Sequence, residues 1–198
     1  MAAALLASCL NNGNPTSSGA VGSNSVLEKI NTAEGKFQGQ YLRYSSSGLL
    51  EVSCNYLDGK LDGPVIYYYP DGKSISKTAT YKNGVLSGRE NLYYPSGTLK
   101  TSFINKSGVI TNVTCYYEDG TLAIDHAMQE NSRKYDSVFY YDNGQIMEES
   151  HCSTNIIHYK AYYRNGQLRK EGQYTEGAML GTWRYYDEAG NQTREIRY

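Results

Sequence analysis

The stretch Tyr93-Tyr94-Pro95-Ser96-Gly97-Thr98-Leu99 recurs along the chain with small changes. Close copies begin at residues 68, 116, 140 and 162, and looser copies lie at residues 44–48 and 185–190. One glycine aligns across all copies: Gly48, Gly72, Gly97, Gly120, Gly144, Gly166 and Gly190. Steps of 22 to 25 residues between these glycines are typical of a repeat array. The sequence is therefore best interpreted one repeat at a time.

Each repeat predicts a β-hairpin and a tight turn into the next hairpin. In residues 64–88, a β-branched and aromatic run precedes Pro70-Asp71-Gly72, and an alternating run precedes Asn83-Gly84. Asp-Gly and Asn-Gly pairs supply the positive φ values that short hairpin loops require. We therefore predict an all-β fold, an elongated single-sheet solenoid of about seven antiparallel hairpin repeats.

Tyrosine dominates the aromatic residues, with 21 Tyr against 3 Phe and 1 Trp. A ring that is apolar along its body and polar at its hydroxyl suits a half-exposed sheet face. We interpret one tyrosine per repeat as part of a ladder that covers the sheet. Exposed parallel rings could alternatively stack on sugars or anchor a protein partner. The ladder residues are Tyr44, Tyr68, Tyr93, Tyr116, Tyr140, Tyr162 and Tyr185.

The N-terminus resembles the end of a bacterial lipoprotein signal peptide. Leu6-Ala7-Ser8-Cys9 resembles a lipobox, in which Cys9 is acylated after cleavage, although no basic segment precedes the short apolar run. An alanine-rich terminus with a chance cysteine is the alternative. We predict a signal remnant in residues 1–9, a flexible Gly/Ser/Asn tether in 10–25, an N-terminal cap in 26–36 and the repeat array in 37–198. This order indicates a lipid-anchored protein of the cell envelope, at the outer membrane or cell surface.

Charge composition argues against one class of partner, and cysteine placement indicates what the cysteines do. Lys plus Arg number 19 and Asp plus Glu number 20, with the signs interspersed, so we expect no nucleic-acid partner. Cys54, Cys115 and Cys152 do not share a place in the repeat. We expect them to be small buried residues, with one disulfide as the alternative.

Two repeats break the pattern, because residues 129–135 and 152–157 replace the second glycine turn. All three histidines, His126, His151 and His158, fall in these repeats. They could mark a binding irregularity or, if they converge with Cys152, a metal or thiol site. They lack the spacing of a known ligand motif, and no nucleophile or phosphate-loop motif is present. We expect no catalytic residues, no metal and no cofactor.

With the repeats laid out, the chain resembles the MORN-repeat variant of bacterial proteins, the YwqK-like antitoxin family. The shared pattern is Tyr-Tyr-x-x-Gly-x-Leu followed by x-Asn-Gly-x-x-x-Gly, as in residues 81–88 and, with Glu-Gly in place of Asn-Gly, in residues 174–181. The resemblance covers residues 37–198 and implies a hairpin solenoid that serves as an interaction surface. The family label implies a toxin partner.

These observations favour a non-catalytic binding or scaffold module. Our first expectation is a membrane-anchored protein that binds a protein partner through its sheet, including an antitoxin-like or immunity role. The alternative is glycan or cell-wall binding through the tyrosine face. An enzyme built on the irregular repeats is the least favoured interpretation.

Overall fold

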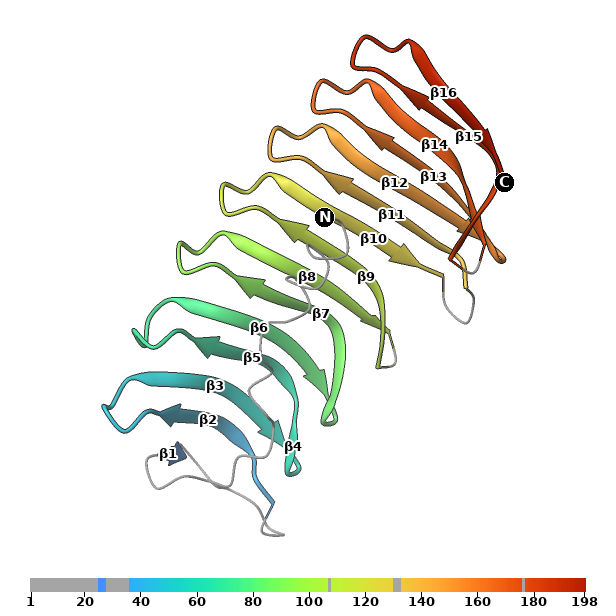
Figure 1. The fold of residues 1–198 in the computed structure, drawn as a ribbon. Helices are drawn as coiled ribbons and strands as arrows, with labels where there is room; N and C mark the ends of the chain where they lie inside the picture. Colours follow the sequence, from blue (N-terminus) through green and yellow to red (C-terminus); the bar gives the residue numbers. More distant parts are fainter. Residues whose placement is uncertain (1–24, 28–35, 107, 130–132, 176) are drawn as a thin grey trace. The chain divides into compact units, whose positions relative to one another are not determined.

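The computed structural model describes residues 25–27, 36–106, 108–129, 133–175 and 177–198. The cleavage region, Cys9, most of the tether and residues 28–35 of the predicted cap lie outside them. The described strands fall into two compact units, divided between Ile110 and Thr111. Figure 1 shows the chain as successive antiparallel strands from β1 to β16.

The N-terminal unit is an open antiparallel sheet in which strand order follows chain order, β1-β2-β3-β5-β6-β7-β8, with the two-residue β4 pairing beside β3. Its strands are β1 (Ser25–Leu27), β2 (Gly39–Tyr44), β3 (Leu50–Leu57), β4 (Lys60–Leu61), β5 (Gly63–Tyr68), β6 (Ile75–Lys82), β7 (Val85–Tyr93) and β8 (Leu99–Lys106). The array therefore begins with a short strand, β1, that pairs with β2.

The C-terminal unit repeats this arrangement, with antiparallel strands from β9 to β16 in chain order; all the described strands belong to one open sheet. Its strands are β9 (Val109–Tyr116), which begins at the unit boundary, β10 (Leu122–Met128), β11 (Tyr135–Tyr140), β12 (Ile146–Ser153), β13 (Ile156–Tyr162), β14 (Leu168–Thr175), β15 (Ala178–Tyr186) and β16 (Gln192–Arg197). The predicted all-β fold of antiparallel hairpin repeats is confirmed in both units.

Six of the seven aligned glycines close three-residue hairpin loops, and Gly72 lies in a four-residue loop. In the loop after β7, the Gly97 amide donates to the Tyr94 carbonyl (2.9 Å), and the Tyr94 amide donates to the Thr98 carbonyl (2.8 Å). This is a turn followed by one residue in the left-handed region, which glycine adopts without steric cost. Gly97 has φ +88°. The Tyr-x-x-Gly spacing therefore sets the loop geometry.

A register shift recurs one step before each of these loops. It lies between Arg43 and Tyr44 in β2, and equivalent shifts precede the ladder tyrosines of β5, β7, β11, β13 and β15. In the last repeat the shift lies between Tyr185 and Tyr186, and Tyr186 stands four places before the loop glycine. The ladder position there is Tyr186, so its assignment to Tyr185 was wrong by one residue.

In four of the tyrosine pairs, the second tyrosine connects one repeat to the next. Its hydroxyl donates to the backbone carbonyl of the following ladder tyrosine, at 2.5 Å from Tyr69 to Tyr93 and at 3.0 Å from Tyr141 to Tyr162. Each bond contributes about 1 kcal/mol. The same bond joins Tyr117 to Tyr140 and Tyr163 to Tyr186, both at 2.8 Å.

Both units bury apolar side chains along the middle of the sheet. Val52, Cys54 and Val65 form a cluster in the N-terminal unit, against which Tyr41 and Tyr67 pack. In the C-terminal unit, Ile124, Ala161 and Trp183 are fully buried. Cys54, Cys115 and Cys152 are buried free thiols, which confirms the expectation that they serve as small core residues.

Trp183 is the largest fully buried side chain. Its ring lies directly against Gly172 on the neighbouring strand β14, where an added Cβ would come within 2.3 Å of the indole. The indole nitrogen donates to the Gln173 carbonyl (3.1 Å), and Tyr174 packs edge-on at 4.7 Å between ring centroids. Within the described residues, no helix is long and apolar enough to cross a bilayer.

Candidate functional site

The C-terminal unit carries a polar groove on the sheet face opposite Trp183. Strand pairing aligns one row of side chains across six strands, and alternation puts them on one face. The row crosses β11 to β16 as Val138, Glu149, Lys160, Glu171, Arg184 and Glu195. We call this set the charged row.

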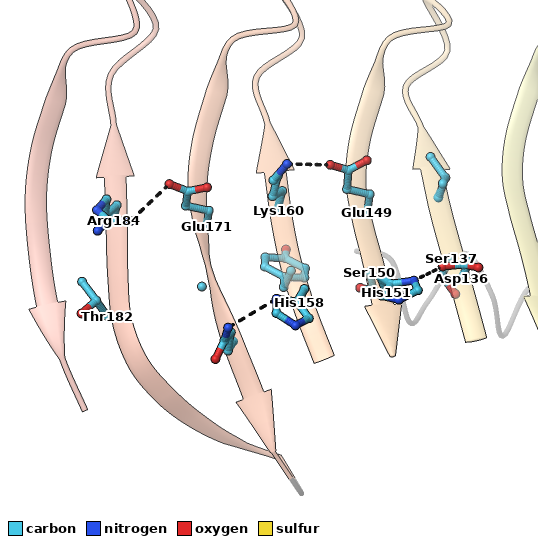
Figure 2. Close-up of a pocket in the computed structure, with 14 residues that line it drawn as sticks. Asp136, Ser137, Glu149, Ser150, His151, His158, Lys160, Glu171, Thr182 and Arg184 are labelled. Atoms are coloured by element: carbon cyan, nitrogen blue, oxygen red, sulfur yellow. Dashed lines mark hydrogen bonds and ion pairs between the residues drawn. The ribbon is translucent and has the colours of Figure 1, made fainter. Parts of the chain in front are cut away.

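A second aligned row lies beside the charged row on the same face. Asp136 in β11 pairs with His151 in β12, which pairs with His158 in β13 and then with Gln173 in β14. We call these four residues the histidine row. Apart from Glu195, the two rows line most of a depression of about 560 Å³ that crosses β11 to β15. Figure 2 shows the lining side chains, with Glu149, Lys160, Glu171 and Arg184 of the charged row labelled.

The charged row holds two similar arrangements in successive repeats. Glu149 Oε1 accepts a hydrogen bond from the Tyr162 hydroxyl (2.6 Å) and lies 3.6 Å from Lys160 Nζ. Glu171 Oε1 accepts from the Tyr186 hydroxyl (3.0 Å) and lies 3.7 Å from an Arg184 guanidinium nitrogen. Both arrangements place a carboxylate between a basic side chain and a ladder tyrosine.

Burial, followed by the Glu149 carboxylate, raises the pKa of the Tyr162 hydroxyl. Tyr162 therefore stays protonated and serves as a hydrogen-bond donor to Glu149. The ion pairs themselves are exposed to solvent, with half of the Lys160 side-chain surface accessible (50 %). Exposed pairs contribute at most about 1 kcal/mol. They can therefore be exchanged for the charges of a bound partner at little cost.

The histidine row is held by its two end residues. Asp136 Oδ1 and His151 Nδ1 share a hydrogen bond, and the Gln173 side-chain amide nitrogen lies 3.3 Å from His158 Nδ1. Both contacts are drawn in Figure 2. Both histidines are exposed, so their rings are accessible from the groove.

The three predicted histidines do not converge. His126 pairs across the strands with Ser137, and His126 Nδ1 shares a hydrogen bond with the Ser137 hydroxyl. Because Ser137 precedes Val138 and follows Asp136, His126 lies on the face opposite the groove. Burial lowers the pKa of His126, which favours its neutral form. Of the three histidines that the sequence grouped as a binding irregularity, only His151 and His158 are cross-strand neighbours.

Cys152 is buried on the face opposite His151, and its Sγ lies 3.9 Å from the Thr154 carbonyl. It cannot join His151 as a nucleophile or ligand without turning out of the core. In the part of the chain that the structure describes, no group of three or more His, Cys, Asp and Glu side chains is arranged to hold a metal ion.

The ladder tyrosines lie at strand ends and are half-buried. The predicted site therefore included the two groove histidines and Tyr162, but it missed Glu149, Lys160, Glu171 and Arg184. The sequence held one sign of them, a basic residue two places before the tyrosine in Lys160-Ala161-Tyr162 and in Arg184-Tyr185-Tyr186. That spacing puts the base and the tyrosine on one face of a strand.

An open antiparallel array with three-residue glycine loops and a tyrosine at each junction defines a hairpin-repeat protein. The family model of the MORN repeat variant matches residues 61–83, 136–151 and 157–176. The chain thus carries MORN repeats, which typically form non-enzymatic binding or scaffolding modules. The second and third matched segments contain the histidine row and much of the charged row. A comparison with curated proteins found no match.

Proposed function

We propose that this chain is a non-catalytic binding module of the bacterial cell envelope that takes a protein partner in the groove of its C-terminal unit. The observation that carries the proposal is the charged row, in which acidic and basic side chains alternate across β12 to β16. Such a row can match the charge order of one partner and repel others.

The character of the groove favours recognition over chemistry. Its charges are exposed and weakly paired, so a partner's side chains can replace the internal ion pairs. Tyr162 and Tyr186 hold the two central carboxylates in fixed positions, which lowers the cost of ordering them on binding. A preorganised polar surface of this kind suits a folded protein or an extended acidic and basic peptide segment.

The anchor and the partner's identity belong to the same proposal. A lipid on Cys9, followed by the tether, would hold the array at the outer membrane or cell surface. An exported toxin is the partner that the antitoxin-like resemblance suggests, which would make the module an immunity protein. Mass spectrometry of the mature N-terminus tests the anchor, since acylation adds a defined mass to Cys9.

Glycan binding through the tyrosines is the second candidate. The half-buried ladder and the hydroxyl bonds from Tyr69 and Tyr141 to backbone carbonyls leave less ring face and fewer hydroxyls for a sugar. This places glycan second, and the same experiment distinguishes the two.

The test is site-specific photocrosslinking of the full-length, lipidated protein in its native envelope. Benzoylphenylalanine replaces Lys160 in the groove or, as the control, Arg194 on the opposite face; both positions are exposed. The proposal expects one protein adduct from the Lys160 position and none from Arg194. Retention on cell-wall material with no protein adduct would favour glycan binding and reject the protein-partner proposal.

A further inference from the structure

The most specific chemical feature of the groove is the histidine pair. His151 and His158 are direct cross-strand partners, two steps from the turn that joins β12 and β13. Directly opposite residues on one face of an antiparallel pair have Cβ atoms about 4.5–5.5 Å apart. Two imidazoles on such a pair can direct one nitrogen each to a common point above the sheet.

Each ring is already oriented by its Nδ1 atom. Asp136 binds Nδ1 of His151, and the Gln173 amide lies beside Nδ1 of His158. When Asp136 accepts the Nδ1 proton, His151 carries its free lone pair on Nε2. The Gln173 amide nitrogen lies 3.3 Å from His158 Nδ1; rotating the amide by 180° brings its oxygen there instead, where it accepts the Nδ1 proton and leaves the His158 lone pair on Nε2. Carboxylate and amide partners of this kind orient and strengthen histidine ligands at metal sites.

We propose that His151 and His158 bind one borderline divalent transition-metal ion, such as Zn²⁺, through their Nε2 atoms. Zinc binds histidine nitrogen at about 2.0–2.1 Å, so a tetrahedral ion needs the two Nε2 atoms about 3.3 Å apart. Both side chains are exposed and can reach this separation by rotation about their own torsions. Water fills the remaining positions.

Two protein ligands are fewer than a structural zinc site has, which leaves open positions on the ion. The ion would lie in the groove beside Glu149 and Lys160, where an incoming carboxylate or imidazole could complete its coordination. The site is therefore suited to a labile ion rather than to one that supports folding. His126 has no part in it, because it lies on the opposite face.

The experiment is a calorimetric titration of the untagged, full-length, EDTA-treated protein with Zn²⁺. Wild-type protein is expected to bind one saturable equivalent. His151→Ala and His158→Ala should each abolish that binding, and both positions are exposed enough to change without unfolding the sheet. Asp136→Asn keeps both histidines but loses the orienting charge, and it should bind roughly tenfold more weakly.

His126→Ala is the matched control and should bind as wild type does. A Cys9→Ser variant tests whether the thiol of Cys9, which lies outside the described residues, binds the zinc instead. No saturable binding by wild-type protein would overturn the proposal. So would binding that survives in both groove variants, binding lost equally in His126→Ala, or binding lost in Cys9→Ser.

Discussion

Gly172→Ala is expected to destabilise the C-terminal unit, although glycine is normally a weak choice inside a strand. An alanine Cβ at this position would lie 2.3 Å from two atoms of the Trp183 indole. Carbon atoms pack best at about 3.5–4.0 Å, so the indole would have to move. Trp183 is fully buried, so its ring cannot move without displacing its neighbours.

The magnitude follows from the contacts of the indole. Overpacking of this kind costs about 1–3 kcal/mol. Moving the ring also weakens the hydrogen bond to the Gln173 carbonyl, worth about 1 kcal/mol, and the edge-on contact with Tyr174, worth about 0.5–1.5 kcal/mol. Alanine regains about 0.5–1 kcal/mol through its lower backbone entropy when unfolded. Together these contributions give an expected net loss in the free energy of unfolding of about 1.5–5 kcal/mol.

Urea unfolding at 25 °C, followed by circular dichroism, measures this loss. The control is the same change in a Trp183→Ala background, where the added methyl group meets no indole and the loss should disappear. A Gly172→Ala protein as stable as wild type would refute the packing argument. Equal losses in both backgrounds would show that the cost arises elsewhere.

Three further predictions concern bonds, turns and thiols. Tyr141→Phe keeps the ring and its contact with the Arg164 guanidinium but removes the hydrogen bond to the Tyr162 carbonyl. Urea unfolding should show a free energy of unfolding lower by about 1 kcal/mol. An unchanged value would show that this bond between repeats does not stabilise the protein. Thr154 is a β-branched residue strained at φ +72°. Thr154→Gly should therefore raise the free energy of unfolding by about 1 kcal/mol. A lower thermal unfolding midpoint would contradict this strain. Burial raises the pKa of the Cys54 thiol to about 11, so at pH 8 it should carry roughly a hundredfold less thiolate than an ordinary cysteine and resist Ellman's reagent until the protein is unfolded. Rapid reaction of the native protein would contradict that burial.

The sequence was sufficient for the repeat fold because each loop needs its own local residues. A glycine such as Gly97 supplies the left-handed residue of a three-residue loop, and that requirement is visible without any tertiary contact. The same holds for Asn83-Gly84 at the second turn, where both residues have positive φ. Burial of the three cysteines was also predictable from residue type.

The groove was much harder to predict, because its faces depend on register. In the hairpins β11–β12, β13–β14 and β15–β16, the strand after the loop carries one extra residue beside the loop, so the alternation of faces does not continue unbroken from one strand to the next. Counting along the sequence therefore could not tell that His126 lies opposite His151. The contact between Gly172 and Trp183 depends on a neighbouring strand, so no local pattern indicated it.

The most direct test of the central claim is the affinity of the captured protein partner for groove variants of the full-length chain. Lys160→Glu combined with Arg184→Glu reverses both basic charges of the charged row, whereas Arg194→Glu makes the same kind of change on the opposite face. The account predicts roughly tenfold or greater weakening by the groove pair and near wild-type affinity for the control. Unchanged affinity in the groove pair, with loss in Arg194→Glu, would contradict it.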